Sequence, residues 1–232
     1  MDQEQNFKME SHERCLILFA RHPEEGKVKT RMVREGNGKL VANLYRCFIE
    51  DCLERMSKGN YRFCVACDPP GKENAFTELF GGDILYTSQR GSDLGSRMYN
   101  AFAECFAEGL RSAVIIGSDI PDLPRGFIEE AFEALDGHDA VIGPSRDGGY
   151  YLIGFSKDSF CRSVFENMAW GTENVFEETL RRLHQEGVSV HVLPAWRDVD
   201  TCEDLHVLMR EYDHPDFGTS KTISFLKAHG FI

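Results

Sequence analysis

The sequence of 232 residues lacks any long hydrophobic stretch. Its longest uncharged apolar run covers only residues 15–20, far short of the ~20 residues that a membrane-spanning helix needs. The first 14 residues are polar and acidic, so they lack the apolar core of a signal peptide and the arginines of a transit peptide. We therefore expect a cytoplasmic protein with no membrane span, in which residues 1–12 form a loosely attached arm.

Positive charge is scarce as well. The chain has 26 Lys and Arg against 38 Asp and Glu, which gives a formal net charge of -12 at pH 7. Such a surface repels nucleic acid and anionic membranes, so neither is an expected partner. A small anion can still be held by a few well-placed cations.

Several metal and catalytic motifs are also missing. No pair of histidines has the His-x-x-x-His spacing of a metal site, and no serine or cysteine lies in a nucleophile elbow. Of the eight cysteines, only Cys64 and Cys67 form a close pair, and no second pair accompanies them. Most of the cysteines lie in apolar periodic segments, where a free thiol behaves as a small hydrophobe. We therefore expect free cysteines in a reducing cytoplasm.

Short apolar segments alternate with helical patterns along the whole chain. This order predicts a three-layer α/β/α sandwich with a mostly parallel central sheet, formed by residues 13–232 as a single domain. In such sheets, ligands bind beyond the carboxyl ends of the strands. The expected strands are residues 15–20, 61–67, 84–87, 113–116, 140–142, 150–155 and 188–193, and the expected helices are 41–56, 94–110, 127–135, 175–183, 202–212 and 220–229.

The loop after the first strand concentrates cations in an otherwise acidic chain. Gly26 permits close approach of the backbone to a ligand, while Arg21, Lys29 and Arg31 can neutralise phosphate charge. The loop matches neither the Walker A motif nor the G-x-G-x-x-G motif. A phosphate cradle and a solvated basic loop therefore both remain open.

Carboxylates follow two other strands. Asp119 comes directly after the fourth strand, where a buried charge needs a partner such as a divalent cation. Asp198 and Asp200 follow the last strand, and at i and i+2 in extended chain they point the same way. The alternative for Asp119 is a helix N-cap or a turn residue, a role that Asp122 suits better. The alternative after the last strand is that Asp200 or Thr201 caps the following helix. We predict a metal site at Asp119 and Asp200.

Two further loops offer substrate contacts. Asp147, Gly148 and Gly149 join two strands, either as a turn with exposed amides that bind substrate oxygens or as a plain hairpin turn. The Trp170 indole can stack on a sugar or base, or anchor its loop in the core. Arg97 lies in the first turn of the helix that follows the third strand.

Six motifs in order resemble the bacterial GT-A-type family named radical-SAM/selenodomain-associated transferase 1, glycosyltransferases of the nucleotide-diphospho-sugar transferase superfamily. The resemblance covers about residues 13–210. Two positions depart from the family pattern: Arg21 stands in place of the expected Lys, and Ile120 stands where the family often has Cys. The motifs occupy residues 19–31, 95–98, 117–123, 143–154, 170–172 and 198–205.

The resemblance implies a site for a nucleotide donor that depends on Mg²⁺ or Mn²⁺. By this resemblance Asp119 and Asp200 match metal ligands, and Gly26, Lys29 and Arg31 match a phosphate-binding loop. We predict Asp119, Lys29 and Asp147 as catalytic residues, with Asp147 as general base if a sugar is transferred. The residues expected to bind the nucleotide and its phosphates are Arg21, Gly26, Lys29, Arg31, Gly95 and Arg97, and those expected to bind the substrate are Asp147, Gly148, Gly149 and Trp170.

Three functions follow as hypotheses. The first is metal-dependent transfer of a glycosyl group from a nucleotide-diphospho-sugar to a small-molecule acceptor. The second is nucleotidyl transfer from a nucleoside triphosphate to a small phosphorylated or carboxylate acceptor, with release of pyrophosphate. The 2-phospholactate guanylyltransferases of the same superfamily are an example. The cationic loop favours this second hypothesis, because a triphosphate needs more cations. The third is nucleotide binding without catalysis.

Overall fold

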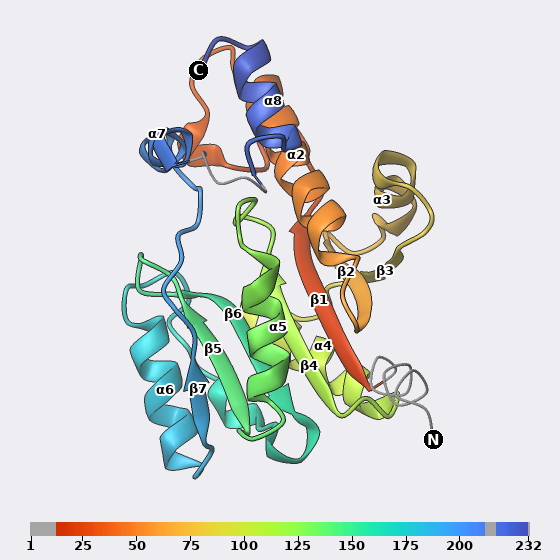
Figure 1. Cartoon of the computed structure of the whole chain (residues 1–232), viewed down its shortest axis with the longest axis vertical. Coiled ribbons are helices and arrows are strands. Elements are labelled where there is room, and N and C mark those ends of the chain that lie inside the picture. The colour runs from red at the N-terminus through yellow and green to blue at the C-terminus, as the bar shows by residue number, and fades with distance from the viewer. Residues whose placement is uncertain (1–12, 212–216, 232) are drawn as a thin grey trace.

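The structure, a computed structural model, describes residues 13–211 and 217–231. The expected arm of residues 1–12 lies outside the described residues. Seven strands form one sheet in the order β3-β2-β1-β4-β6-β5-β7 (Figure 1). Their bounds are β1 Arg14–Arg21, β2 Arg62–Asp68, β3 Leu85–Ser88, β4 Ser112–Gly117, β5 Ala140–Pro144, β6 Tyr150–Ser156 and β7 Val190–Val192.

The strand pairing confirms a mostly parallel sheet. β1 pairs in parallel with β2 and β4, β2 with β3, and β5 with β7. Among the strands of the described residues, only β6 runs antiparallel, to both β4 and β5. It does so because the two-glycine segment after β5 makes a tight hairpin turn, which cannot lead into a parallel strand.

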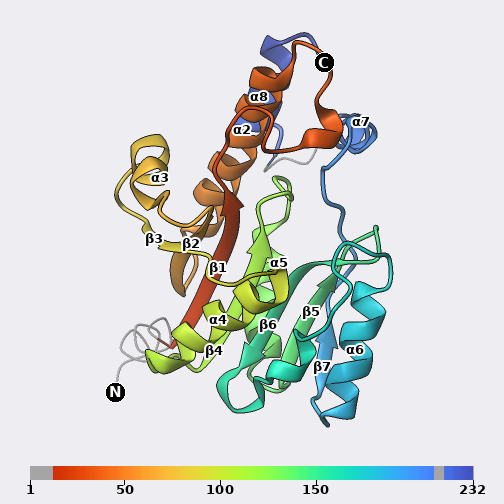
Figure 2. The same ribbon diagram turned by 180° about the vertical axis from the view of Figure 1, so that it is seen from behind.

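Helices cover both faces of the sheet, which confirms the three layers (Figures 1 and 2). One apolar core joins the sheet to α2, α3, α5, α7 and α8, and a second core joins its other face to α4 and α6. The helix bounds are α2 Gly38–Met56, α3 Glu73–Phe80, α4 Leu94–Ala107, α5 Arg125–Ala134, α6 Val175–Gln185, α7 Cys202–Glu211 and α8 Lys221–Ala228, with short 3₁₀ helices at η1 Thr30–Met32, η2 Lys157–Ser159 and η3 Arg162–Val164.

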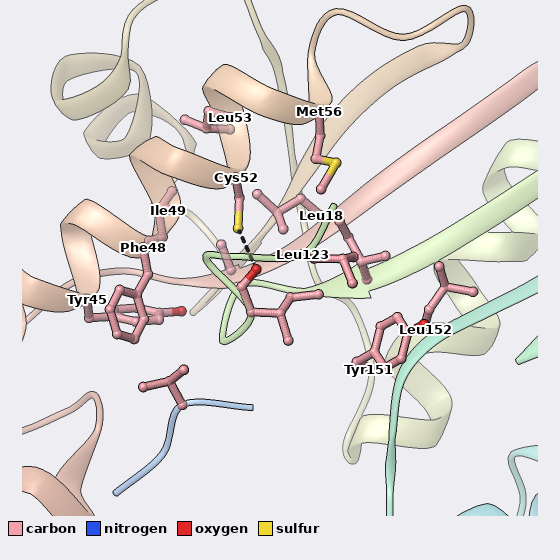
Figure 3. Packing of buried hydrophobic residues seen from close by; sticks show 14 of the residues in the cluster. Leu18, Tyr45, Phe48, Ile49, Cys52, Leu53, Met56, Leu123, Tyr151 and Leu152 are labelled. Atoms are coloured by element: carbon pink, nitrogen blue, oxygen red, sulfur yellow. Dashed lines mark hydrogen bonds between the residues drawn. The ribbon is translucent and has the colours of Figure 1, made fainter. Parts of the chain in front are cut away.

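Helix α2 shows how the sequence pattern becomes packing. Leu44, Phe48, Cys52 and Met56 recur at four-residue spacing and are all buried, as predicted. Figure 3 shows this face of α2 lying over β1 and over the loop that follows β4, with the Cys52 thiol donating to the Ile120 carbonyl. The contact fixes the distance between α2 and the end of β4, where Asp119 lies.

The close pair of cysteines is divided between the two faces of the sheet. Cys64 belongs to the core beneath α4, whereas Cys67 belongs to the core beneath α2 and α3. Side chains three residues apart on a strand point to opposite faces, so these two thiols cannot chelate one ion. All eight cysteines are free thiols in the structure.

The carboxylate of Asp51 on α2 anchors helix α8. It accepts hydrogen bonds from the backbone N–H groups of Lys221 at 2.7 Å and Thr222 at 2.9 Å, and its residue is buried. We expect Asp51→Ala to lower the free energy of unfolding by about 2–3 kcal/mol, because two buried donors lose their acceptor. Urea denaturation measures this loss. Asp51→Asn keeps one acceptor oxygen, so its free energy of unfolding should fall by less. A loss below about 0.5 kcal/mol for Asp51→Ala contradicts the anchoring role.

No helix within residues 13–211 and 217–231 has the length and apolar character needed to cross a membrane.

Candidate functional site

A cavity of about 640 Å³ opens beyond the carboxyl ends of β1, β2 and β4. Its charged lining comes from segments far apart in the sequence, which the parallel strands bring to one edge of the sheet. Four cationic and five acidic side chains line it. The cations are Arg21, Lys29, Arg31 and Arg97, and the acids are Asp68, Asp93, Asp119, Asp198 and Asp200.

Lys29 joins the two aspartates that the sequence predicts as metal ligands. Its Nζ lies 2.6 Å from Asp119 Oδ1 and 2.6 Å from Asp200 Oδ1. The lysine side chain is only 4% exposed, whereas those of Asp119 and Asp200 are 43% and 38% exposed. Burial lowers the pKa of the ammonium, but the two carboxylates outweigh it and leave that pKa above its ordinary value. The lysine therefore lies charged beneath two carboxylates that are open to the cavity.

The loop after β1 is built to aim Lys29 inward. Val28 and Met32 on either side are buried in the core, so the backbone between them is fixed. Lys29 itself has a left-handed backbone conformation, with φ of 47°. Gly26 also has positive φ, at 72°, which favours glycine there. Gly26 shapes the turn but does not line the cavity.

The segment after β7 is held directly against the end of β4. The Val199 N–H donates to the Asp119 carbonyl at 2.9 Å, and the Val199 side chain is fully buried. Asp198 and Asp200 therefore both face the cavity, as their i and i+2 spacing predicts. This register brings three carboxylates from two strand ends into one corner.

Burial and three carboxylate neighbours raise the pKa of Asp198 to about 7. Loss of hydration is the largest cause, followed by the charges of Asp119, Asp147 and Asp200, while Lys29 opposes them. Asp198 appears in the sequence motif but was not among the predicted site residues. Its two-residue separation from Asp200 is the signal that could have identified it.

The raised pKa of Asp198 makes stability depend on pH. Stability that comes from the protonated group is present below the ordinary pKa of 3.8 and is lost as pH rises through about 7. Above pH 7, we expect the free energy of unfolding of Asp198→Asn to exceed that of the wild type by about 2 kcal/mol. The expected difference is smaller than the full pKa shift implies, because water in the open cavity screens the charges. Near pH 3 the difference should vanish. Urea denaturation of both proteins in EDTA, from pH 3 to above pH 7, measures this difference. A difference that stays constant with pH contradicts the raised pKa of Asp198.

A second ion-pair group lies across the cavity. The carboxylate of Asp68, at the end of β2, accepts a hydrogen bond from Arg21 Nε at 2.9 Å and another from an Arg97 guanidinium nitrogen at 3.0 Å. The predicted phosphate ligands Arg21 and Arg97 are therefore brought together, but their charge is partly offset. Only Arg31 among the four cations of the lining forms no ion pair with the described residues.

Asp68 and Tyr45 are cavity residues that the sequence pattern did not single out. The Tyr45 hydroxyl lies 2.6 Å from Ser118 Oγ and accepts a hydrogen bond from the Arg21 N–H at 3.1 Å. It thus links the end of β1 to the end of β4 across α2. Tyr45 lies on the buried face of a helix, where the apolar pattern predicts only core packing. No feature of the sequence therefore indicates that its hydroxyl contributes to the cavity.

The turn with Asp147, Gly148 and Gly149 lies outside the lining of the cavity. Asp147 Oδ1 accepts hydrogen bonds from the Gly149 N–H at 3.0 Å and from the Ser145 hydroxyl, as in an ordinary turn. Gly148 has φ of 90°, and a Cβ there would lie 2.1 Å from the Glu173 carbonyl oxygen. Turn geometry and close packing account for the glycine. The charge of Asp147 still reaches Asp198.

Trp170 also lies outside the lining of the cavity. It is half-buried and packs edge-on against Tyr150, with ring centroids 6.4 Å apart. A Cβ on Gly95 would lie 2.3 Å from the Phe165 carbonyl oxygen and 2.8 Å from the indole of Trp170. Gly95 therefore permits close packing of α4 against this loop.

Asp122 lies in a turn, which is one of its two expected roles, but it does not cap the following helix. Pro124 precedes α5, and no side chain caps that helix end. Asp122 instead accepts a hydrogen bond from Trp196 Nε1 at 3.1 Å and pairs with Arg197 at 3.4 Å. A long-range partner provides this ion pair, and local sequence patterns cannot reveal it.

The two predicted metal ligands fit a cation that is shared with phosphate. Within the described part of the chain, no three Asp, Glu, His or Cys side chains gather closely enough to hold a metal ion. Mg²⁺, however, is commonly bound by one or two carboxylates together with substrate phosphates and water. Asp119 and Asp200 supply such a pair, with oxygen as the only ligand atom.

Comparison with known proteins relates this geometry to a family. Residues 52–172 match the family described as uncharacterized protein conserved in bacteria (DUF2064). A crystal structure from Desulfovibrio desulfuricans G20, provisionally named a nucleotide-diphospho-sugar transferase, is 37% identical with a TM-score of 0.91. The alignment covers 95% of this chain and 96% of that one. The expected superfamily, its fold and the class of transferase, glycosyl or nucleotidyl, are confirmed at this level.

Two more distant proteins are nucleotidyltransferases. The 2-phospho-L-lactate guanylyltransferase of Methanopyrus kandleri is 34% identical over 94 residues, which is 39% of this chain and 46% of that protein. The match therefore spans less than half of the guanylyltransferase. A cytidylyltransferase from Leptospira borgpetersenii is 15% identical with a TM-score of 0.55, covering 95% and 96% of the two chains. This second likeness concerns the fold alone.

Proposed function

Since this chain belongs to the DUF2064 family and has the fold of a nucleotide-diphospho-sugar transferase, we propose that it transfers a glycosyl group from a nucleotide-diphospho-sugar in a metal-dependent reaction. The donor occupies the cavity at the ends of β1, β2 and β4. Mg²⁺ or Mn²⁺ is the proposed cofactor, and the acceptor is a small molecule.

The charge balance of the cavity carries this proposal. Five acids line the cavity against four cations, and three of the cations are already paired with carboxylates. Even with Asp198 partly protonated near pH 7, the lining carries no net positive charge, so it attracts a phosphate chain only weakly unless a divalent cation accompanies it. A nucleoside triphosphate carries roughly two more negative charges than a diphosphate-sugar. With one divalent ion, the cavity suits the diphosphate better, so the pairing of the cations removes the preference for a triphosphate that the cationic loop suggested.

The proposed roles follow from position. Asp119 and Asp200 hold the cation, which when bound supplies Lewis-acid stabilisation of the departing nucleoside diphosphate. Arg31 donates hydrogen bonds to phosphate oxygens, and Arg21 and Arg97 add positive charge on the far wall. Each of these cations lies where a diphosphate in the cavity would meet it.

Asp147 remains the proposed general base. Its residue is exposed, and Oδ2 forms no hydrogen bond with the described residues, although Oδ1 is used by the turn. Its charge reaches Asp198 in the cavity lining, and we propose that it accepts the proton of an acceptor hydroxyl as the glycosyl bond forms. Gly148, Gly149 and Trp170 also lie outside the lining, and we propose that the acceptor or sugar extends from the cavity to meet them.

Nucleotidyl transfer is the second candidate, and the guanylyltransferase match favours it. In that reaction the acceptor attacks the α-phosphate of a triphosphate and pyrophosphate leaves. The same carboxylate pair would serve both reactions. The identity of the released product separates them, because glycosyl transfer releases a nucleoside diphosphate.

A thermal-shift screen tests the proposal. Nucleoside triphosphates, diphosphates and common nucleotide-sugars are each added with Mn²⁺, with Mg²⁺ and with EDTA. A ligand at about 100 times its Kd stabilises the native state by about 2.7 kcal/mol, which raises the Tm by roughly 5–10 °C here. We expect the largest metal-dependent shift from one nucleotide-sugar. A shift confined to one triphosphate supports nucleotidyl transfer, and no shift at all contradicts both.

A further inference from the structure

Lys29 points at the carboxylate pair, and its side chain is almost completely buried beneath it. Its ammonium lies 2.6 Å from one oxygen of each aspartate, so those two oxygens cannot be farther apart than twice that distance. On its other side lie the rings of Tyr45 and Phe48, with centroids 5.7 and 5.8 Å away. An ammonium has three donor protons, and two of them serve the carboxylates. This arrangement differs from the phosphate-binding role that the sequence suggests.

The lysine and a divalent cation would compete for the same negative charge. A unit charge interacts strongly with another a few ångströms away wherever water is partly excluded, and Lys29 is almost completely buried. While the ammonium offsets Asp119 and Asp200, the pair attracts a second cation less. The exposed outer faces of both carboxylates remain accessible from the cavity.

We propose that Lys29 is the resident counter-ion of the site. It holds Asp119 and Asp200 together in the ligand-free protein and weakens their binding of a divalent cation. The inference rests on the proposed function, in which this pair holds the metal. Lys29 therefore positions the two carboxylates and does not itself contact the substrate. As a consequence, Asp119 and Asp200 would hold a divalent cation tightly only with the phosphates of a nucleotide beside them.

The test measures Mn²⁺ binding without any nucleotide, by the electron paramagnetic resonance signal of free Mn²⁺. Lys29→Met removes the charge at similar length, and Lys29→Gln does so while keeping a donor for one carboxylate. We expect both variants to bind Mn²⁺ about tenfold or more tightly than the wild type. Lys27→Met is the matched control, because Lys27 is exposed on the same loop. It should bind Mn²⁺ as the wild type does.

Equal or weaker Mn²⁺ binding by the folded Lys29 variants overturns the inference. Circular dichroism shows whether each variant is folded. If Lys29→Met does not fold, Mn²⁺ binding by Lys29→Gln decides the result. The double variant Lys29→Gln with Asp119→Asn separates this inference from the proposed function. Its Mn²⁺ binding should return to the weak level of the wild type. Tight binding that persists in the double variant places the ion elsewhere, which overturns both the inference and the proposed metal site.

Discussion

Asp119→Asn should abolish metal-dependent nucleotide binding while leaving the fold intact. The change removes the charge of one proposed ligand and one of the two carboxylates on Lys29. Without it, the cavity cannot share a divalent cation with the phosphates of a donor. We expect the Tm increase of roughly 5–10 °C that a saturating metal–nucleotide pair gives the wild type to disappear. Thermal-shift measurements with Mn²⁺ and the best ligand of the screen determine it.

A matched control separates this effect from a general loss of charge. Asp136→Asn also removes one carboxylate with an ion-pair partner, Arg14, but it lies outside the lining of the cavity. Its ligand-dependent shift should equal that of the wild type. An Asp119→Asn protein that keeps the full shift shows that the cation is held elsewhere.

Phe102→Ala should lower the free energy of unfolding by about 3–5 kcal/mol, more than any other proposed substitution. Phe102 on α4 is fully buried, and four phenylalanine rings surround it with centroids 5.3–6.1 Å away. Those rings belong to α4, β6 and the loops around η2 and η3, so they cannot all move to fill the space left by the missing ring. The free energy of unfolding from guanidinium titration measures the effect.

Leu94→Ala provides the comparison on the same helix. Leu94 is 45% exposed, so its truncation should cost less than about 1 kcal/mol. A Phe102→Ala protein no less stable than Leu94→Ala would contradict the packing described for this core.

The strands and most helices could be predicted because their apolar spacing is strong. Helix α3 was missed, since only Phe76 among its eight residues is buried and the pattern is too short to read. The antiparallel β6 was left open because Gly148 and Gly149 suit a hairpin or a ligand-binding turn equally well. In both cases tertiary packing decided between local options that the sequence leaves equivalent.

The grouping of charged residues at one cavity could be predicted, but the pairing of those charges could not. The rule that ligands bind beyond strand ends correctly groups Arg21, Lys29, Asp119 and Asp200 at one cavity. It does not say which cation meets which acid. The bond between Lys29 and Asp200 joins residues 171 positions apart, and Asp68 gathers Arg21 and Arg97 from two other elements. Such contacts depend on register and loop conformation, which a single sequence does not encode locally.

The most direct test of the account is the position of Mn²⁺ in crystals grown with a nucleotide-sugar, located by anomalous scattering. The account predicts one peak about 2.1 Å from a carboxylate oxygen of Asp119 and of Asp200, and in contact with the diphosphate. A diphosphate bound in this cavity with no Mn²⁺ beside the two aspartates would contradict the account, as would a Mn²⁺–nucleotide pair bound outside the cavity.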